Sequence, residues 1–354
     1  MANRLKALRR LMRDAYAEAF LIKKPENIYY LSGLKTTEAS LLLTTRTLYL
    51  IVDSRYYLKA KKTTNLSVLL LEGKLESFLK SFLKEKSINK LAFESNFLTF
   101  KQVKSIKGKT KLIEADGWVE KIRQVKTDTE INIIKHSAKL ADKAISFDKH
   151  SVSLGMSEIQ LAKKIECFIR QKEGRGESFE TIVASGPNSA LPHYTSGKRS
   201  IKPGDALLID MGVKYKNYVS DITRTFLLEP VKPTIKKMYL TCLRAQENAL
   251  KKVQSAVNTK EVDKEARDYI EKYYPSKFEH NLGHGLGLEI HEEPVVGPKS
   301  NSKLSKNMVI TVEPGIYIEG KGGVRIEDMV LIKDNGKRIL TKSPKNIEDI
   351  IIEL

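Results

Sequence analysis

A strand–turn–strand segment with an acidic residue near each end occurs twice in this sequence, and it constrains the fold more than any other feature. In residues 210–221, apolar residues that suit strands flank a polar turn. A hairpin centred between Tyr215 and Lys216 places Asp210 directly across from Asp221. Side chains opposed in this way have Cβ atoms about 5 Å apart. The segment therefore predicts an antiparallel ribbon with two neighbouring carboxylates, although a solvated pair of surface aspartates would show the same spacing.

A second segment, residues 311–328, repeats this arrangement. Glu313 and Glu327 lie at equal distances from Gly320, so they face each other if the glycine-rich middle forms the turn. The same glycines do not suit a phosphate-binding loop, because no helix pattern follows them. The sequence therefore predicts a second ribbon with a second pair of acids.

We expect these four acids to be partly buried. Apolar residues flank them, namely Leu207, Leu208, Ile209, Ile310 and Val312. Burying like charges together costs several kcal/mol unless a positive charge compensates them. A pair of divalent metal ions is the simplest source of that charge.

Histidines gather in one stretch that offers a fifth ligand. The chain has 6 histidines, and His280, His284 and His291 fall within a single stretch of twelve residues. Glycines at 283 and 285 let the backbone approach a site closely and leave the imidazole of His284 free to project. Four carboxylates and one imidazole suit Mn(II), Co(II) or Zn(II) better than a metal that prefers thiolates. Two such ions can hold a hydroxide between them at neutral pH, which indicates hydrolytic chemistry.

The chain of 354 residues is long enough for two domains, and its pattern changes near residue 126. Residues 1–125 alternate strand and helix patterns and lack clustered histidines or paired acids, so we expect an interface or a substrate-gating role for them. Residues 126–354 begin with a capping box at Thr127 and Glu130 and contain both acidic ribbons. The fold class is therefore α/β, of the α+β kind, with a smaller α/β domain before the catalytic domain.

Composition excludes several classes of protein. With 41% hydrophobic and 30% charged residues, the chain has the composition of a globular protein. No apolar run approaches the length that spans a bilayer, and the first residues lack the apolar centre of a secretory signal. The two cysteines, Cys167 and Cys242, cannot build a disulfide framework. We therefore expect a cytoplasmic protein that does not associate with membranes.

The formal net charge of +19 raises the question of a nucleic-acid partner. Residues 1–125 hold 25 basic and 12 acidic residues, but the lysines are scattered singly or in pairs. No block of like charge and no RNA-binding aromatic motif accompanies them. We therefore expect a generally basic surface and no specific nucleic acid.

Together, these motifs resemble the metal signature of the pita-bread metallopeptidases. The matching segments are Asp-x10-Asp, Gly-His-Gly-x-Gly, His-Glu-Glu-Pro, Val-Glu-Pro-Gly-Ile-Tyr and Val-Arg-Ile-Glu-Asp. Within this group the match is closest to Xaa-Pro aminopeptidases and Xaa-Pro dipeptidases (prolidases). Residues 27–33 and 53–57 resemble the creatinase-like N-terminal domain of the same family. The resemblance implies a catalytic domain with a curved antiparallel sheet and flanking helices.

The resemblance also implies roles for individual residues. The metal ligands would be Asp210, Asp221, His284, Glu313 and Glu327, holding two divalent ions, with manganese preferred and cobalt or zinc as alternatives. Asp221 and Glu327 would bridge the ions, and Glu313 would also accept a proton from the attacking water. His193 would hold substrate and move protons, while His291 would stabilise the tetrahedral oxyanion. The remaining positions are Arg325, which would orient the carboxylates, and His280, which would line the substrate pocket.

The implied reaction is hydrolysis of the bond between an N-terminal residue and a following proline by a hydroxide that bridges the two ions. We expect a Xaa-Pro aminopeptidase, because Val295 and Val296 follow Pro294 where a basic residue would bind the carboxylate of a free dipeptide. A Xaa-Pro dipeptidase is the principal alternative. The resemblance further implies a homodimer that acts on peptides with proline in the second position.

Two more distant alternatives are disfavoured by the sequence. Methionine aminopeptidases share the aspartate pair and the Gly-His-Gly histidine, but they lack this long N-terminal half and separate their two glutamates more widely. A non-catalytic basic scaffold of the same fold would be expected to have lost ligands, whereas all five stand in this sequence.

Overall fold

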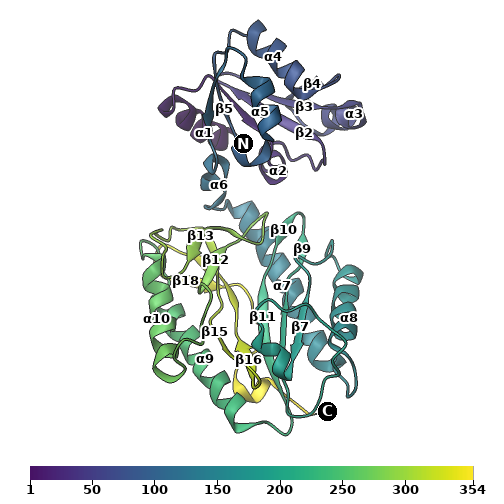
Figure 1. Cartoon of the computed structure of the whole chain (residues 1–354), viewed down its shortest axis with the longest axis vertical. Coiled ribbons are helices and arrows are strands. Elements are labelled where there is room, and N and C mark those ends of the chain that lie inside the picture. The colour runs from purple at the N-terminus through teal and green to yellow at the C-terminus, as the bar shows by residue number, and fades with distance from the viewer. Residues whose placement is uncertain (354) are drawn as a thin grey trace. The chain divides into compact units, whose positions relative to one another are not determined.

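The computed structural model describes residues 1–353 (Figure 1), and the chain separates into two compact units, Met1–Arg123 and Gln124–Leu354. Each unit has its own sheets and its own cluster of buried apolar side chains. None of the helices in residues 1–353 combines the length and the apolar character that crossing a bilayer requires.

The first unit, described in full, is a six-stranded sheet covered by helices. Its strands are β1 (Ala19–Ile22), β2 (Ala39–Thr44), β3 (Leu48–Val52), β4 (Ser67–Leu70), β5 (Lys90–Phe93) and β6 (Lys111–Glu114), in the order β4-β3-β2-β1-β5-β6. Strand β2 is antiparallel to its neighbours and the other pairs are parallel. The helices are α1 (Ala2–Asp14), α2 (Pro25–Ser32), α3 (Ser54–Thr63), α4 (Leu75–Glu85), α5 (Phe100–Lys107) and α6 (Trp118–Arg123), with a short turn η1 (Ser95–Phe97). Every residue of β1 is buried, as expected for a strand covered on both faces.

A buried carboxylate connects two of these elements. Glu94 follows β5 and is 3% exposed. It accepts hydrogen bonds from the backbone N–H groups of Lys23 (2.6 Å) and Lys24 (2.7 Å), at the start of α2, and from the amide of Asn27 (2.6 Å). Burial raises the pKa of Glu94, although these donors favour the charged form.

The second unit, described over residues 124–353, packs helices against two principal sheets. The helices are α7 (Asp128–Ser151), α8 (Glu158–Gln171), α9 (Pro233–Lys252) and α10 (Thr259–Tyr273), with short turns η2 (Gly186–Ala190) and η3 (Ile347–Asp349). One sheet has the order β19-β11-β8-β7, from β7 (Ile182–Ser185), β8 (Ala206–Met211), β11 (Ile222–Leu228) and β19 (Ile351–Ile352). The other has the order β13-β12-β14-β17-β18, from β12 (Gly283–Gly285), β13 (Glu292–Val296), β14 (Val309–Val312), β17 (Asp328–Ile332) and β18 (Lys337–Ile339). Two-stranded ribbons pair β9 (Lys214–Tyr215) with β10 (Tyr218–Val219), and β15 (Gly315–Ile318) with β16 (Gly322–Arg325).

The first acidic ribbon has a different register from the one we expected. Lys216 and Asn217 form its turn, with φ of 46° and 68°, the left-handed pair that two-residue hairpins favour. Asp210 therefore pairs with Thr223. Asp221 precedes Thr223 by two residues along the same chain segment. Because side chains alternate with a period of two, this shift keeps both acids on one face. The predicted register was wrong, but the predicted proximity of the two carboxylates does not depend on it.

The second acidic ribbon has the expected register. Val312 pairs with Asp328 in the β14–β17 ladder, and Gly315 pairs with Arg325 in the β15–β16 ladder. The same register runs through both ladders, so Glu313 and Glu327 occupy facing positions in the break between them. The left-handed Gly320 (φ 72°) lies in the turn that closes the ribbon.

Candidate metal centre

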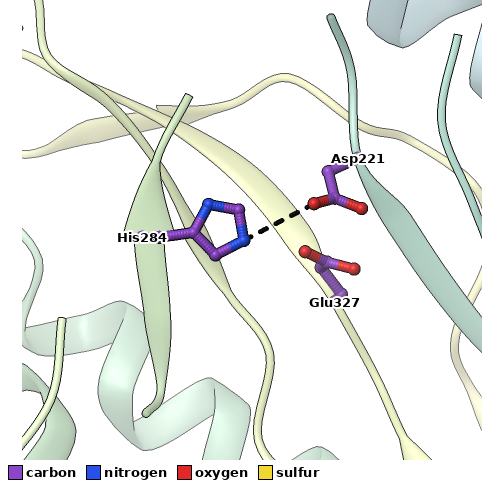
Figure 2. Close-up of side chains that lie close together, drawn as sticks. All are labelled: Asp221, His284 and Glu327. Carbon is purple, nitrogen blue, oxygen red and sulfur yellow. Dashed lines mark ion pairs between the residues drawn. The ribbon is translucent and has the colours of Figure 1, made fainter. Parts of the chain in front are cut away.

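Three side chains that are far apart in the sequence meet between the two principal sheets (Figure 2). Asp221 precedes β11, His284 is the central residue of β12, and Glu327 lies between β16 and β17. Each contributes one potential ligand atom, and these atoms all lie within 4.8 Å of one another. Such spacing brings all three within reach of one metal ion.

Close backbone packing fixes His284 in this position. A Cβ added to Gly283 would lie 2.1 Å from the carbonyl oxygen of Thr311, and one added to Gly285 would lie 2.4 Å from that of Glu293. Only glycine allows β12 to fit between its neighbours here. The Nδ1 of His284 donates to the carbonyl of Gly285 at 3.0 Å, which leaves Nε2 to face the acids.

The Nε2 atom of His284 faces two carboxylates. It lies 3.5 Å from Oδ2 of Asp221, the contact marked in Figure 2, and 3.3 Å from Oε1 of Glu313. A lone pair on nitrogen and two carboxylate oxygens repel one another at this spacing. A positive charge among them, either a proton on Nε2 or a metal ion, removes the repulsion.

Two buried carboxylate oxygens have no donor. Within residues 1–353, Oδ1 of Asp210 and Oε1 of Glu327 make no hydrogen bond. The second oxygen of each acid is held, because Arg325 donates to Oδ2 of Asp210 and Thr223 donates to Oε2 of Glu327 at 2.8 Å. Native proteins rarely leave buried oxygens unpaired. A carboxylate that is held through one oxygen and unpaired at the other can bind a divalent cation through the unpaired oxygen.

The acids also perturb one another electrostatically. Burial, followed by the charges of Glu327 and Asp210, raises the pKa of Asp221 well above its ordinary value. Burial and the charges of Glu313 and Asp210 do the same to the pKa of Glu327. Burial acts the same way on Glu313, but its contact with His284 outweighs this and lowers its pKa to about 2. The cluster therefore carries more negative charge than its own side chains compensate, and these residues fit a divalent ion.

The other predicted site residues surround this cluster. Arg325 is 4% exposed and reaches both Asp210 and, at 2.9 Å, the hydroxyl of Tyr317. Tyr317 in turn lies 2.9 Å from Nε2 of His280. Because Nδ1 of His280 faces the carbonyl of Asn281 at 2.8 Å, Nδ1 carries the proton and the tyrosine hydroxyl donates to Nε2. Burial lowers the pKa of His280.

The two remaining histidines of the predicted site, His193 and His291, are exposed. His291 lies in the loop before β13, and its ring centroid is 4.4 Å from that of His284. Burial and the neighbouring His284 lower the pKa of His291. His193 follows η2, and its charge acts on both His280 and His291. The structure thus gathers eight of the nine predicted residues around one centre, and His193 is near enough to act electrostatically on two of them. The chemical roles of all nine stay predictions.

Sequence reasoning missed the hydroxyl groups that orient the ligands. Thr223 holds Glu327, Thr311 donates to Oε1 of Glu313 at 3.2 Å, and Tyr317 joins Arg325 to His280. The signal for Thr223 was Asn217, a residue that tolerates left-handed backbone at the second position of a two-residue turn. Centring the turn between Lys216 and Asn217 would have placed Thr223 across from Asp210.

Comparison with known proteins agrees with this geometry. The model of metallopeptidase family M24 matches residues 132–334, and that of the creatinase/prolidase N-terminal domain matches residues 4–125. The Xaa-Pro dipeptidase of Pyrococcus furiosus is 36% identical over 98% of this chain and 100% of its own length.

Solved structures give the same result. A Xaa-Pro dipeptidase from Bacillus anthracis superposes with a TM-score of 0.96 at 36% identity, covering 100% of this chain and 99% of that chain. An X-Pro aminopeptidase from Thermotoga maritima superposes with a TM-score of 0.89 at 36% identity, covering 98% and 100%. The family resemblance, the pita-bread fold and the assignment as a hydrolytic enzyme are thereby confirmed. The chain belongs to metallopeptidase family M24 and is a metal-dependent peptidase with a creatinase/prolidase-type N-terminal domain.

Proposed function

We propose that this peptidase is a Xaa-Pro dipeptidase, which releases proline from the carboxyl end of a dipeptide. The sequence led us to expect an aminopeptidase because Val295 and Val296 follow Pro294. Relatives that span nearly the whole chain favour the dipeptidase instead, among them the Pyrococcus furiosus and Bacillus anthracis proteins. The presence or absence of one basic residue carries less weight than likeness over the full length.

The observation that carries the metal-dependent part of the proposal is the meeting of Asp221, His284 and Glu327, with unpaired oxygens on Asp210 and Glu327. We propose all five predicted ligands as the binding set for two divalent ions, manganese in preference to cobalt or zinc. Such ions polarise the scissile carbonyl and make a water molecule a stronger nucleophile at neutral pH.

The protein's own residues position the substrate and move its protons. Glu313 lies beside His284 at the edge of the cluster, where its carboxylate accepts a proton from the attacking water. His291 is exposed toward solvent beside His284, where it can donate to the oxyanion that develops on the carbonyl. His193 can return a proton to the leaving proline nitrogen. Arg325 keeps Asp210 oriented through its hydrogen bond.

The proline bond explains why such a site is useful. Its nitrogen is a tertiary amide with no N–H, and its ring is bulky, so a general peptidase handles it poorly. The half-buried His280 and the buried Tyr317 provide a wall for a ring of this kind. A free substrate amine can bind to the acids, which restricts action to the N-terminus.

Xaa-Pro aminopeptidase activity is the second candidate. Its support is the pair Val295 and Val296, which offers no cation for the carboxylate of a free dipeptide, and the likeness to the Thermotoga maritima enzyme. The two activities differ only in whether the chain continues after proline. Substrate length therefore separates them.

The experiment compares Gly-Pro with a longer peptide that begins Gly-Pro, each with added manganese, cobalt or zinc. We expect faster release of proline from the dipeptide, with manganese giving the highest rate. Faster cleavage of the longer peptide would support the aminopeptidase. Cleavage of neither, with metal bound at the expected stoichiometry, would contradict both.

We also propose that the chain acts as a homodimer and that its first unit contributes to the interface or to substrate access. Sedimentation of the full chain tests the first point. Comparison of KM for dipeptides and longer peptides after substitutions in the first unit tests the second.

A further inference from the structure

The loop Leu286–His291, between β12 and β13 (Figure 1), is built around one carboxylate. Glu292, the first residue of β13, turns its side chain back into this loop. Its Oε1 accepts hydrogen bonds from the backbone N–H groups of Leu288 (2.9 Å) and Glu289 (3.2 Å). The conformation of the loop therefore depends on the position of this carboxylate.

Close packing shows how tightly the loop surrounds Glu292. A Cβ added to Gly287 would lie 2.8 Å from Oε2 of Glu292, so a larger residue at this position would displace the carboxylate. The carbonyl of Gly287 accepts from the N–H of Val219 at 2.9 Å, and its N–H donates to the carbonyl of Glu289 at 3.0 Å. The loop is thus fixed between Glu292 and the ribbon that leads to Asp221.

The charge of Glu292 is balanced by a lysine from the start of the second unit. Nζ of Lys126 lies 3.1 Å from Oε2 of Glu292, and the two side chains are 1% and 6% exposed. The backbone N–H of Lys126 donates to the carbonyl of Asn307 at 2.9 Å, and the next residue, Thr127, caps α7 with Glu130. Both ends of this lysine are therefore anchored. Breaking such a buried pair by removing one partner is strongly destabilising, so the position of the Glu292 carboxylate depends on Lys126.

The pair lies next to a residue of the site. His291 is the last residue of the loop and directly precedes Glu292. In the described part of the chain its imidazole makes no side-chain hydrogen bond, and its nearest ring is that of His284. The loop backbone, together with this ring contact, therefore determines where the imidazole lies.

We propose that Lys126 is a positioning residue for His291, acting through the carboxylate of Glu292 and the loop that this carboxylate organises. The proposal rests on the proposed function in one respect, namely that His291 contacts the substrate. It adds to the site a residue that lies 166 positions before Glu292 in the sequence and is not a metal ligand.

The test uses the full chain and four variants. K126M keeps the length of the side chain and removes its charge, E292Q keeps the shape and the carbonyl oxygen, and K126M/E292Q removes both charges together. K306M is the matched control, because Lys306 pairs with Asp334 at the surface, where the side chains are 55% and 67% exposed. Amide hydrogen exchange of the metal-free proteins, metal content, and kcat and KM for Gly-Pro are measured for each.

We expect exchange at residues 286–291 to rise at least tenfold in K126M, while residues 206–228 and 309–332 and the metal content stay as in the wild type. We expect kcat to fall about tenfold to a hundredfold, as when groups that orient a site are removed, with KM within about threefold. The double variant should be closer to the wild type than K126M, because its glutamine still accepts from the loop and both charges of the pair are removed together. K306M should match the wild type throughout.

Unchanged loop exchange in K126M, or a double variant in which the two losses simply add, would overturn the proposal. If K126M does not fold, E292Q and the double variant decide by the same comparison. A wild-type protein that leaves Gly-Pro intact would contradict the proposed function, whereas the exchange data would still decide whether Lys126 fixes the loop.

Discussion

Glu327 and Asp328 are adjacent in the sequence, both 1% exposed, and differ in almost everything else. Asp328 is surrounded by positive and donor groups. It accepts from Arg224 at 2.7 Å and from Lys345, with Thr341 (2.8 Å) and Gln246 (3.2 Å) completing its hydrogen bonds. Burial opposes ionisation, but Arg224 and Lys345 outweigh it and lower the pKa of Asp328.

Glu327 points to the other side of the same chain segment, where it meets like charges. Its donor is a neutral hydroxyl, that of Thr223, and one of its oxygens has no partner among residues 1–353. Burial and the charges of Glu313 and Asp210 raise its pKa. Consecutive side chains of extended backbone point in opposite directions, so one strand serves both environments.

The difference shows what distinguishes a structural acid from a proposed metal ligand. Both residues are equally buried, so burial alone does not identify the site. What identifies the site is a negative charge without a positive partner. The charge of Asp328 is balanced by Arg224 and Lys345, whereas the acids around Glu327 need a cation from outside the chain. Substitutions on the two faces should therefore fail in different ways.

The largest expected effect is that of Asp221→Ala. We expect Gly-Pro hydrolysis to fall by at least about a thousandfold, because the loss of a proposed metal ligand would remove several kcal/mol of transition-state stabilisation. The free energy of unfolding of the metal-free protein should not fall, because a repelling charge has been removed. Steady-state kinetics measures the loss of activity, and urea unfolding measures the stability. Unchanged turnover would contradict the site assignment.

Asp328→Ala should show the opposite pattern. Arg224 and Lys345 would be left buried without a partner, so we expect a loss of about 3–5 kcal/mol in the free energy of unfolding. Urea unfolding followed by circular dichroism measures it. A variant as stable as the wild type would mean that the compensated face does not contribute to stability, and the contrast with Glu327 would be lost.

Thr223→Val tests the face of Glu327 without touching a charge. The hydroxyl donates to Glu327 and accepts from Nε of Arg325 at 3.1 Å, so its removal should lower kcat about tenfold to a hundredfold. Thr241→Val in α9 is the control, because its hydroxyl donates to the carbonyl of Lys237 in the same helix and contacts the hydroxyl of Tyr274, and neither partner is a predicted site residue. Equal activities of the two variants would remove Thr223 from the site.

Much of this arrangement could be predicted from the sequence because acids and glycines have local signatures. The equal spacing of Glu313 and Glu327 about Gly320 gave the register of the second ribbon correctly. The register of the first ribbon depended on which residues take left-handed backbone, and these are Lys216 and Asn217, one position beyond the predicted centre of the turn. An error of two residues kept the correct face, so the ligand set was unaffected.

The compensating groups could not be predicted in the same way. The sequence separates Lys126 from Glu292 by 166 positions and Arg224 from Asp328 by 104 positions. Whether such residues pair depends on how distant segments pack. Buried cations have no local pattern that separates them from the many surface lysines of this chain. The local pattern also does not settle substrate length: Val295 and Val296 after Pro294 favoured the aminopeptidase, whereas relatives that span the chain favour the dipeptidase.

The smallest expected effect concerns Glu94 in the first unit, a third kind of buried acid, whose partners are neutral N–H groups. Burial raises its pKa above the ordinary 4.5, so the folded state keeps a proton that the unfolded chain has released. Raising the pH through this range must therefore lower the free energy of unfolding. Urea unfolding at several pH values above 4.5, followed by the fluorescence of Trp118, measures this in the first unit.

Trp118 is suited to this because it is the single tryptophan and packs against Phe20, with ring centroids 5.1 Å apart. Other groups also titrate, so the informative quantity is the difference in slope between the wild type and Glu94→Gln, which cannot ionise. The variant should lose less stability than the wild type as the pH rises. Identical slopes would mean that the N–H donors keep Glu94 ionised throughout, and that neutral donors alone can stabilise a buried carboxylate. The acids around His284 would then need a metal ion because they repel one another, and not because they are buried.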